Sequence, residues 1–112
     1  MGYRVVIEVK EVRGRCPVYK PGDRIVVERF YIKCGESKDV CLHALCAMST
    51  LLSSFMRGYS ARSLGIGLRD NVGYLQCPDP GSPYTCGGTV VFELRREPLE
   101  VGALTGSQKQ NA

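Results

Sequence analysis

The 112-residue sequence has no tryptophan, a single histidine and no Cys-x-x-Cys pair. One histidine excludes a metal site built from several imidazoles. The missing Cys-x-x-Cys pair removes the signatures of zinc knuckles and thioredoxin-like redox centres. No apolar run approaches the roughly 20 residues that a membrane-spanning helix needs. We therefore expect neither a histidine-rich metalloprotein nor a protein with a membrane partner.

A strong excess of one charge is also missing. The net charge is +4, and basic residues alternate with acidic ones, as in Arg4, Glu8 and Lys10. A nucleic-acid-binding protein normally gathers its basic residues on one face, so the sequence offers little support for a nucleic-acid partner. The same charges interrupt the apolar positions of the N-terminal segment, unlike a secretory signal. We therefore expect a cytoplasmic protein.

Cysteine, in contrast, is plentiful, with residues at Cys16, Cys34, Cys41, Cys46, Cys77 and Cys86. In the reducing cytoplasm such a set favours metal binding, catalysis or simple burial over disulfides. Proteins of hyperthermophiles are the exception, and the ten arginines against five lysines weakly favour a thermophilic source.

Alternating and β-branched segments predict four strands, over residues 3–12, 24–33, 72–76 and 88–97. In the last strand Val90, Phe92 and Leu94 are expected to face inward. Asp39 has the chemistry of a helix N-cap. From Cys41 an apolar stripe with spacings of three and four predicts the main helix, which ends before the C′ residue Gly58. Its members are Cys41, Ala44, Leu45, Met48, Leu51, Leu52 and Phe55.

The order strand, strand, helix, strand, strand predicts a small α+β domain over residues 1–100. One helix would pack on one face of a mostly antiparallel four-stranded sheet. Residues 59–71 are expected to form a loop with a short turn. The tail over residues 101–112 has little to bury and is expected to be disordered.

Three cysteines share the features of a site. Cys41 is expected in the first turn of the helix, where free N–H groups and the helix dipole favour a thiolate, although burial as a small apolar residue is equally compatible with its position. Cys16 and Cys77 each precede a proline, which holds them extended. If both loops reach the helix N-terminus, the three thiols converge, with Cys34 or Cys86 as a fourth ligand.

A competing interpretation pairs Cys77 with Cys86. If residues 72–76 and 88–92 form a hairpin, the two cysteines flank its loop, within the range of a disulfide. A bond there would remove Cys77 from any metal site. The prolines, glycines and aspartates of the loops around Asp23 and Asp79 predict tight turns. His43 lies about 200° around the helix from Cys41 and is not expected to act as its base.

Three segments together carry a resemblance: "GRCPVYKPGDRIVV" (14–27), "VCLHAL" (40–45) and "CPDP" with "VVFELRR" (77–96). In order and spacing they resemble a family of small uncharacterised proteins of anaerobic bacteria and archaea. The resemblance implies no function, but it singles out Cys16, Lys20, Gly22, Asp23, Cys41, Ala44, Cys77, Pro78 and Asp79. This sequence departs from the pattern at Tyr19, where the family often has His, and at Leu42, where a Pro commonly follows the helix Cys.

Three functions remain open from the sequence. The first is a centre for zinc or an iron–sulfur cluster built from Cys16, Cys41 and Cys77, with Cys34 or Cys86 as the fourth ligand. The second is a small adaptor, homo-oligomer or ribonucleoprotein component whose cysteines are structural. The third is a thiol enzyme with Cys41 as nucleophile, which lacks a base. A non-enzymatic role is therefore favoured.

Overall fold

The computed structural model describes residues 2–99. In order, the chain forms β1 (Tyr3–Arg13), β2 (Arg24–Glu28), β3 (Tyr31–Ile32), a 3-10 turn η1 (Cys34–Glu36), α1 (Leu42–Met56), α2 (Ala61–Leu64), β4 (Val72–Gln76) and β5 (Thr89–Pro98). The tail predicted to be disordered, residues 101–112, lies outside the described residues. Within residues 2–99, no helix has the length and apolar character that crossing a bilayer requires.

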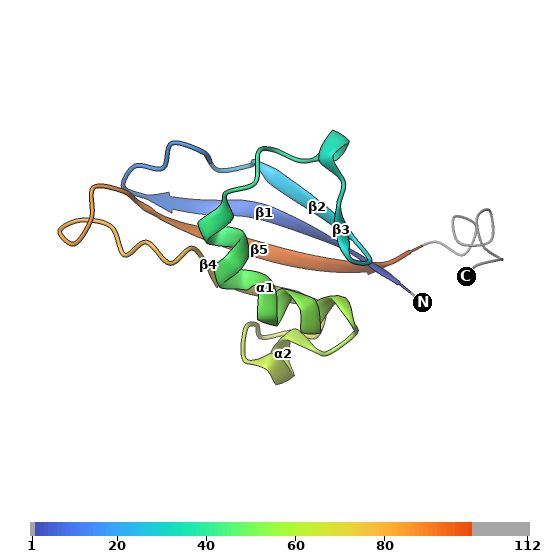
Figure 1. Ribbon diagram of the computed structural model, residues 1–112. Coiled ribbons are helices and arrows are strands. Elements are labelled where there is room, and N and C mark those ends of the chain that lie inside the picture. Colours follow the sequence, from blue (N-terminus) through green and yellow to red (C-terminus); the bar gives the residue numbers. More distant parts are fainter. Residues whose placement is uncertain (1, 100–112) are drawn as a thin grey trace.

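The strands form one antiparallel sheet in the order β3-β2-β1-β5-β4. Figure 1 shows α1 lying across one face of this sheet, with α2 beside its C-terminal end. The predicted α+β class with one main helix is confirmed. The predicted number of four strands is wrong, because the described part of the sheet has five.

The additional strand comes from a break within residues 24–33. Glu28 pairs with Tyr31, so Arg29 and Phe30 form a two-residue turn between β2 and β3. Arg29 has a φ of 55°, in the left-handed region that tight hairpin turns use. The sequence predicts one continuous strand here because neither arginine nor phenylalanine is a typical turn residue.

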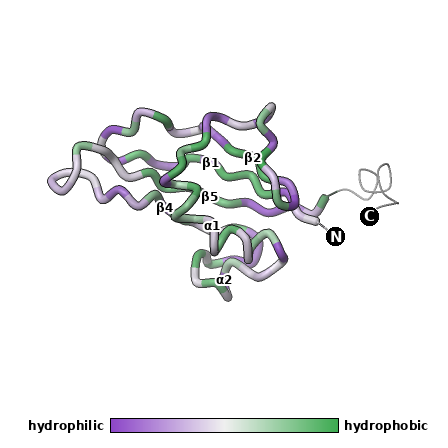
Figure 2. The backbone as a smooth tube through the Cα atoms, viewed as in Figure 1, coloured by the Kyte–Doolittle hydropathy of each residue, from purple (hydrophilic) through white to green (hydrophobic). Residues whose placement is uncertain are grey.

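The core lies between α1 and the sheet. Ile7 of the central strand β1 pairs with Ile25 of β2 and with Leu94 of β5, and all three side chains are buried. In Figure 2 the hydrophobic colour runs along β1 and β2, in the sheet beside α1. The predicted inward residues of the last strand are buried, and so are five residues of α1: Ala44, Met48, Leu52, Phe55 and Met56. The predicted apolar stripe therefore faces the sheet.

The start of α1 differs from the prediction. The N-cap is Cys41, not Asp39, and the Cys41 carbonyl accepts the first helical hydrogen bond from Leu45 at 3.0 Å. The preceding segment remains extended because Lys38 donates to the Arg24 carbonyl at 2.9 Å, which ties the chain to β2. At the other end Gly58 has a φ of 105° and follows the helix, as predicted.

Residues 59–71, predicted as a loop, contain the short helix α2. The Ser60 hydroxyl caps it by accepting hydrogen bonds from the N–H groups of Arg62 and Ser63, at 3.1 and 3.3 Å. The segment then runs along β4, where the Ile66 carbonyl accepts a 2.7 Å bond from Tyr74. This contact covers part of the edge of β4, which would otherwise present free pairing groups.

Arg96 anchors the end of α1 to the sheet. Its side chain lies over the rings of Tyr3 and Phe55, with the guanidinium carbon 4.8 and 4.4 Å from the ring centroids. It also donates to the carbonyls of Phe55 at 2.6 Å and Tyr59 at 2.7 Å. The residue is 8% exposed. Arg96 is therefore a buried cation with a structural role.

Candidate functional site

A cavity of about 510 Å³ lies at the N-terminus of α1. Its walls come from three separate segments: the loop after β1, the first turn of α1, and the loop between β4 and β5. The three cysteines singled out by the sequence all line it, together with Tyr19, His43 and Asp79. The structure therefore brings Cys16, Cys41 and Cys77 to one cavity, as the sequence predicts for converging loops.

Cys16 lies in a compact turn. Its Sγ accepts a hydrogen bond from the backbone N–H of Tyr19 at 3.4 Å, and Pro17 lies between the two. The side chain is half-buried. An N–H group aimed at a sulfur stabilises negative charge on that sulfur.

Cys41 is held by Tyr19, the same residue whose N–H donates to Cys16. Its backbone N–H donates to the phenolic oxygen of Tyr19 at 2.8 Å. Tyr19 is itself 5% exposed and packs edge-on against Phe92, with 5.6 Å between ring centroids. Burial raises the pKa of Tyr19, so the phenol is neutral. Tyr19 thus joins the Cys16 turn to the N-cap of α1.

Cys77 is the most buried of the three, at 7% exposed. Its Sγ accepts a hydrogen bond from the N–H of Val90 at 3.2 Å and lies 3.7 Å from the Gly88 carbonyl. Gly88 has no room for a side chain, because a Cβ there would lie 2.5 Å from the Arg13 carbonyl oxygen. This close approach brings the strand that carries Val90 against the loop that carries Cys16.

Asp79 organises the loop beside Cys77. Its carboxylate accepts hydrogen bonds from the Thr85 hydroxyl and from the Gly81 N–H, the latter at 2.8 Å. The hydrogen bond from Thr85, followed by that from the Gly81 N–H, holds the pKa of Asp79 below its usual value. The predicted turn role is thus visible in the structure.

The predicted turn at Asp23 is likewise stabilised by hydrogen bonds to an aspartate carboxylate. Asp23 accepts hydrogen bonds from the backbone N–H of Lys20 at 2.9 Å and from its ammonium at 3.2 Å. These bonds, the backbone one first, lower the pKa of Asp23. Both residues lie outside the lining of the cavity. Lys20 and Asp23 therefore support the loop that carries Cys16 and Tyr19.

His43, which is not predicted from the sequence to act on Cys41, also lines the cavity. It belongs to the first turn of α1 and is exposed, yet it lines the cavity together with Cys41 and Asp79. A helix angle of 200° separates His43 from Cys41 on an ideal cylinder, but a cavity at a helix end is bordered by the whole first turn. The position of His43 within that turn is the signal that could have identified it.

The remaining cysteines lie elsewhere. Cys34, Cys46 and Cys86 are exposed, and none of them lines the cavity. All six cysteines are free thiols, so the structure contains no bond between Cys77 and Cys86. Within residues 2–99, no three Cys, His, Asp or Glu side chains are placed so that they could hold one metal ion without moving.

Several charged side chains on the sheet face opposite α1 are paired with each other. Arg4 contacts Glu28 and Glu36 at 3.0 Å each, and Glu93 contacts Arg95 and Lys10. Each of these basic side chains is therefore already engaged with a carboxylate.

No described protein family, no curated protein and no solved structure matches this chain. The resemblance to small prokaryotic proteins therefore stays a prediction.

Proposed function

We propose that the cavity at the N-terminus of α1 binds a soft metal centre, zinc or an iron–sulfur cluster, through Cys16, Cys41 and Cys77. The observation that carries the proposal is that three thiols from distant parts of the chain line one cavity. Thiolates are the preferred ligands of zinc and of iron–sulfur clusters.

The backbone around these sulfurs supports the proposal. Two of the sulfurs, those of Cys16 and Cys77, accept N–H hydrogen bonds at 3.4 and 3.2 Å. The third belongs to the N-cap of α1, where the positive end of the helix dipole lies. Hydrogen bonds to ligand sulfurs and nearby positive dipoles are the means by which proteins stabilise metal-bound thiolates. Each of the three thiols therefore has its own source of stabilisation for negative charge.

Metal binding requires the thiols to turn toward a common point. Rotation of a cysteine side chain between two staggered positions moves its sulfur by about 3 Å. Cys16 and Cys41 are half-buried and border the cavity, so such rotations need no change in the strands. His43 and Asp79, which line the same cavity, are better placed as a fourth ligand than Cys34 or Cys86, which do not.

The test is the metal content of protein purified without oxygen, combined with cobalt titration. Thiolate ligands give bound cobalt an intense charge-transfer absorption, which oxygen ligands do not produce. We expect close to one equivalent of zinc, or the visible spectrum of an iron–sulfur cluster. Cys16→Ser, Cys41→Ser and Cys77→Ser are each expected to weaken cobalt binding at least tenfold.

Cys46→Ser is the matched control, because Cys46 is an exposed cysteine on the same helix. We expect its cobalt affinity to equal that of the wild type. Metal-free protein whose cobalt spectrum lacks thiolate absorption would contradict the proposal. Stoichiometric co-purification of such metal-free protein with a macromolecular partner would instead favour the adaptor function.

A further inference from the structure

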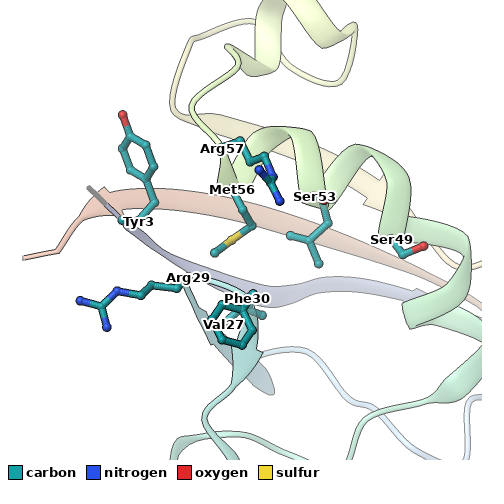
Figure 3. Close-up of a pocket in the computed structure, with 10 residues that line it drawn as sticks. Tyr3, Val27, Arg29, Phe30, Ser49, Ser53, Met56 and Arg57 are labelled. Atoms are coloured by element: carbon teal, nitrogen blue, oxygen red, sulfur yellow. The ribbon is translucent and has the colours of Figure 1, made fainter. Parts of the chain in front are cut away.

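A second cavity, of about 510 Å³, lies beside the C-terminal half of α1, and its lining residues differ from those of the cysteine cavity. Figure 3 shows it between the helix and the turn that joins β2 to β3. The buried residues Val27, Leu52 and Met56 form an apolar floor. A side chain of another molecule that enters this space would therefore contact apolar surface.

Exposed aromatic surface continues from this floor. Phe30 lines the cavity and is 88% exposed. Its neighbour Tyr31 is 39% exposed and meets the Phe30 ring edge-on, with 5.4 Å between the ring centroids. Aromatic residues are enriched where proteins bind one another, and exposed apolar side chains beside a cavity are typical of such sites.

The edge of the cavity is positively charged at two separate points. Arg57 lies on the helix side, whereas the Arg29 side chain packs beside Gly2 and leads away from the helix (Figure 3). Within residues 2–99 no acidic residue lines the cavity, and neither arginine forms an ion pair. Two guanidinium groups that point apart do not enclose one small anion. They fit two carboxylates that are spaced along a chain.

The helix side of the cavity allows a close approach. Ser49 and Ser53 lie one turn apart on α1, line the cavity and are exposed. Because both side chains are short, a polypeptide segment that runs along α1 can reach the floor. The serine hydroxyls can also donate hydrogen bonds to the backbone carbonyls of such a segment.

We propose that this cavity binds a short acidic segment of a partner protein, anchored by one large apolar side chain. The anchor lies on the floor against Phe30, and acidic residues on either side of it pair with Arg29 and Arg57. A buried apolar anchor supplies affinity and complementary charge supplies specificity in protein interfaces. A nucleic acid would pair with the arginines but bring no aliphatic side chain to the floor, so the floor favours a protein partner. The inference is independent of the metal centre.

The test is selection from a random peptide library displayed on phage, with the immobilised full chain as the target. We expect the enriched peptides to share one large apolar residue flanked by aspartate or glutamate. In the best peptide, replacing the acidic residues by their amides, or the apolar anchor by serine, should weaken binding by about tenfold or more. Added salt should also weaken it. No enrichment over an unrelated immobilised protein, or enriched peptides without acidic residues, would overturn the proposal.

Substitutions locate the binding on the chain. Arg29→Gln, Arg57→Gln and Phe30→Ser are each expected to weaken binding of the selected peptide by about tenfold, with little change in melting temperature because all three residues are exposed. Arg69→Gln and Tyr84→Ser are the matched controls, at an exposed arginine and an exposed tyrosine outside the cavity, and should change the affinity less than about twofold. Equal losses in the controls and in the cavity variants would contradict the site.

Two other occupants of the cavity are distinguished with the same variants. A short single-stranded RNA that binds more tightly than the selected peptide, and that loses affinity in Phe30→Ser, would make a nucleic acid the occupant and overturn the proposal. Sedimentation measures the oligomeric state, and we expect Phe30→Ser to leave it unchanged. A wild-type dimer that dissociates in Phe30→Ser would show that a second copy of the chain fills the cavity, which would also overturn the proposal.

Discussion

The phenolic oxygen of Tyr19 accepts a 2.8 Å hydrogen bond from the backbone N–H of Cys41. Through this bond one buried side chain connects the loop after β1 with the first turn of the main helix. The Tyr19 N–H in turn donates to Cys16. Two of the three cavity thiols are therefore positioned by the same tyrosine.

Tyr19→Phe tests this connection. The substitution keeps the packing against Phe92 but leaves the Cys41 N–H without its acceptor. We expect the free energy of unfolding to fall by about 1–2 kcal/mol, measured by urea denaturation. Tyr84→Phe, at a tyrosine that is 80% exposed, is the control and should change stability by less than about 0.5 kcal/mol. Equal effects of the two substitutions would show that the Tyr19 hydroxyl has no structural role.

Arg96 provides a second prediction, because five hydrogen bonds from its guanidinium join the end of α1 and residues 70–71 to β5. Arg96→Ala leaves buried carbonyl groups without donors and removes the contact with Tyr3 and Phe55. We expect a loss of about 2–4 kcal/mol in unfolding free energy. Arg96→Lys should recover part of it, because an ammonium keeps the charge but lacks the planar fork.

The neighbouring Arg95 is the control for this experiment. It lies on the opposite face of the sheet, is more exposed and pairs only with Glu93 in the described chain. Arg95→Ala should cost less than about 1 kcal/mol. A similar loss of stability in Arg95→Ala and Arg96→Ala would contradict the assignment of Arg96 as the anchor of α1.

Gly88 provides a third prediction. A Cβ at this position would meet the Arg13 carbonyl oxygen and the Arg15 nitrogen, both at 2.5 Å. Gly88→Ala is therefore expected to push the loop of Cys16 away from Cys77, at a cost of about 1–3 kcal/mol and with weaker cobalt binding. Gly35→Ala, where nothing lies within 4 Å of the added methyl, is the control for the effect of alanine itself. Unchanged cobalt affinity in Gly88→Ala would mean that this close approach does not shape the cavity.

The fourth prediction concerns pH. Hydrogen bonds lower the pKa of Asp79, from Thr85 first, and of Asp23, from the Lys20 backbone first. A carboxyl whose pKa is lower in the folded than in the unfolded state contributes stability above its unfolded value of about 3.9. This contribution is lost as the pH falls through the folded pKa.

Urea denaturation between pH 7 and pH 2 measures this effect. We expect the stability to decrease below about pH 4 and Asp79→Asn to reduce that decrease. Carbon-detected NMR titration of the aspartates checks the assignment directly. An Asp79 that titrates at or above its ordinary value would contradict the role of the Thr85 and Gly81 bonds.

The sequence predicts those parts of the structure that depend on regular periodicity. Apolar residues recur every second position in β1, which buries one face of a strand. They recur every three or four positions in α1, which buries one face of a helix. Both elements are confirmed. The turn at Arg29 and Phe30 could not be predicted, because neither arginine nor phenylalanine is a typical residue of a left-handed turn. The N-cap at Cys41 could not be predicted because the preceding segment is kept extended by long-range hydrogen bonds with β2, from the Val26 N–H to the Ser37 hydroxyl and from the Lys38 N–H to the Arg24 carbonyl.

For the candidate site, the sequence predicts convergence of Cys16, Cys41 and Cys77 only on the condition that both loops reach the helix N-terminus, and no local pattern shows that they do. The role of Tyr19 could not be predicted, because a hydrogen bond between residues 22 positions apart leaves no local pattern. Arg96 was missed for the same reason, since its partners lie 25 to 41 positions away in the chain.

The most direct test of the central claim is X-ray absorption spectroscopy of the zinc-loaded protein. Zinc bound to thiolates shows sulfur neighbours at about 2.3 Å, a distance clearly separated from nitrogen or oxygen neighbours at about 2.0 Å. We predict three sulfur neighbours in the wild type, two in Cys77→Ser and three in Cys46→Ser. A zinc site surrounded only by nitrogen and oxygen, or a sulfur count unchanged in Cys77→Ser, would contradict the assignment of the cavity as a three-cysteine metal centre.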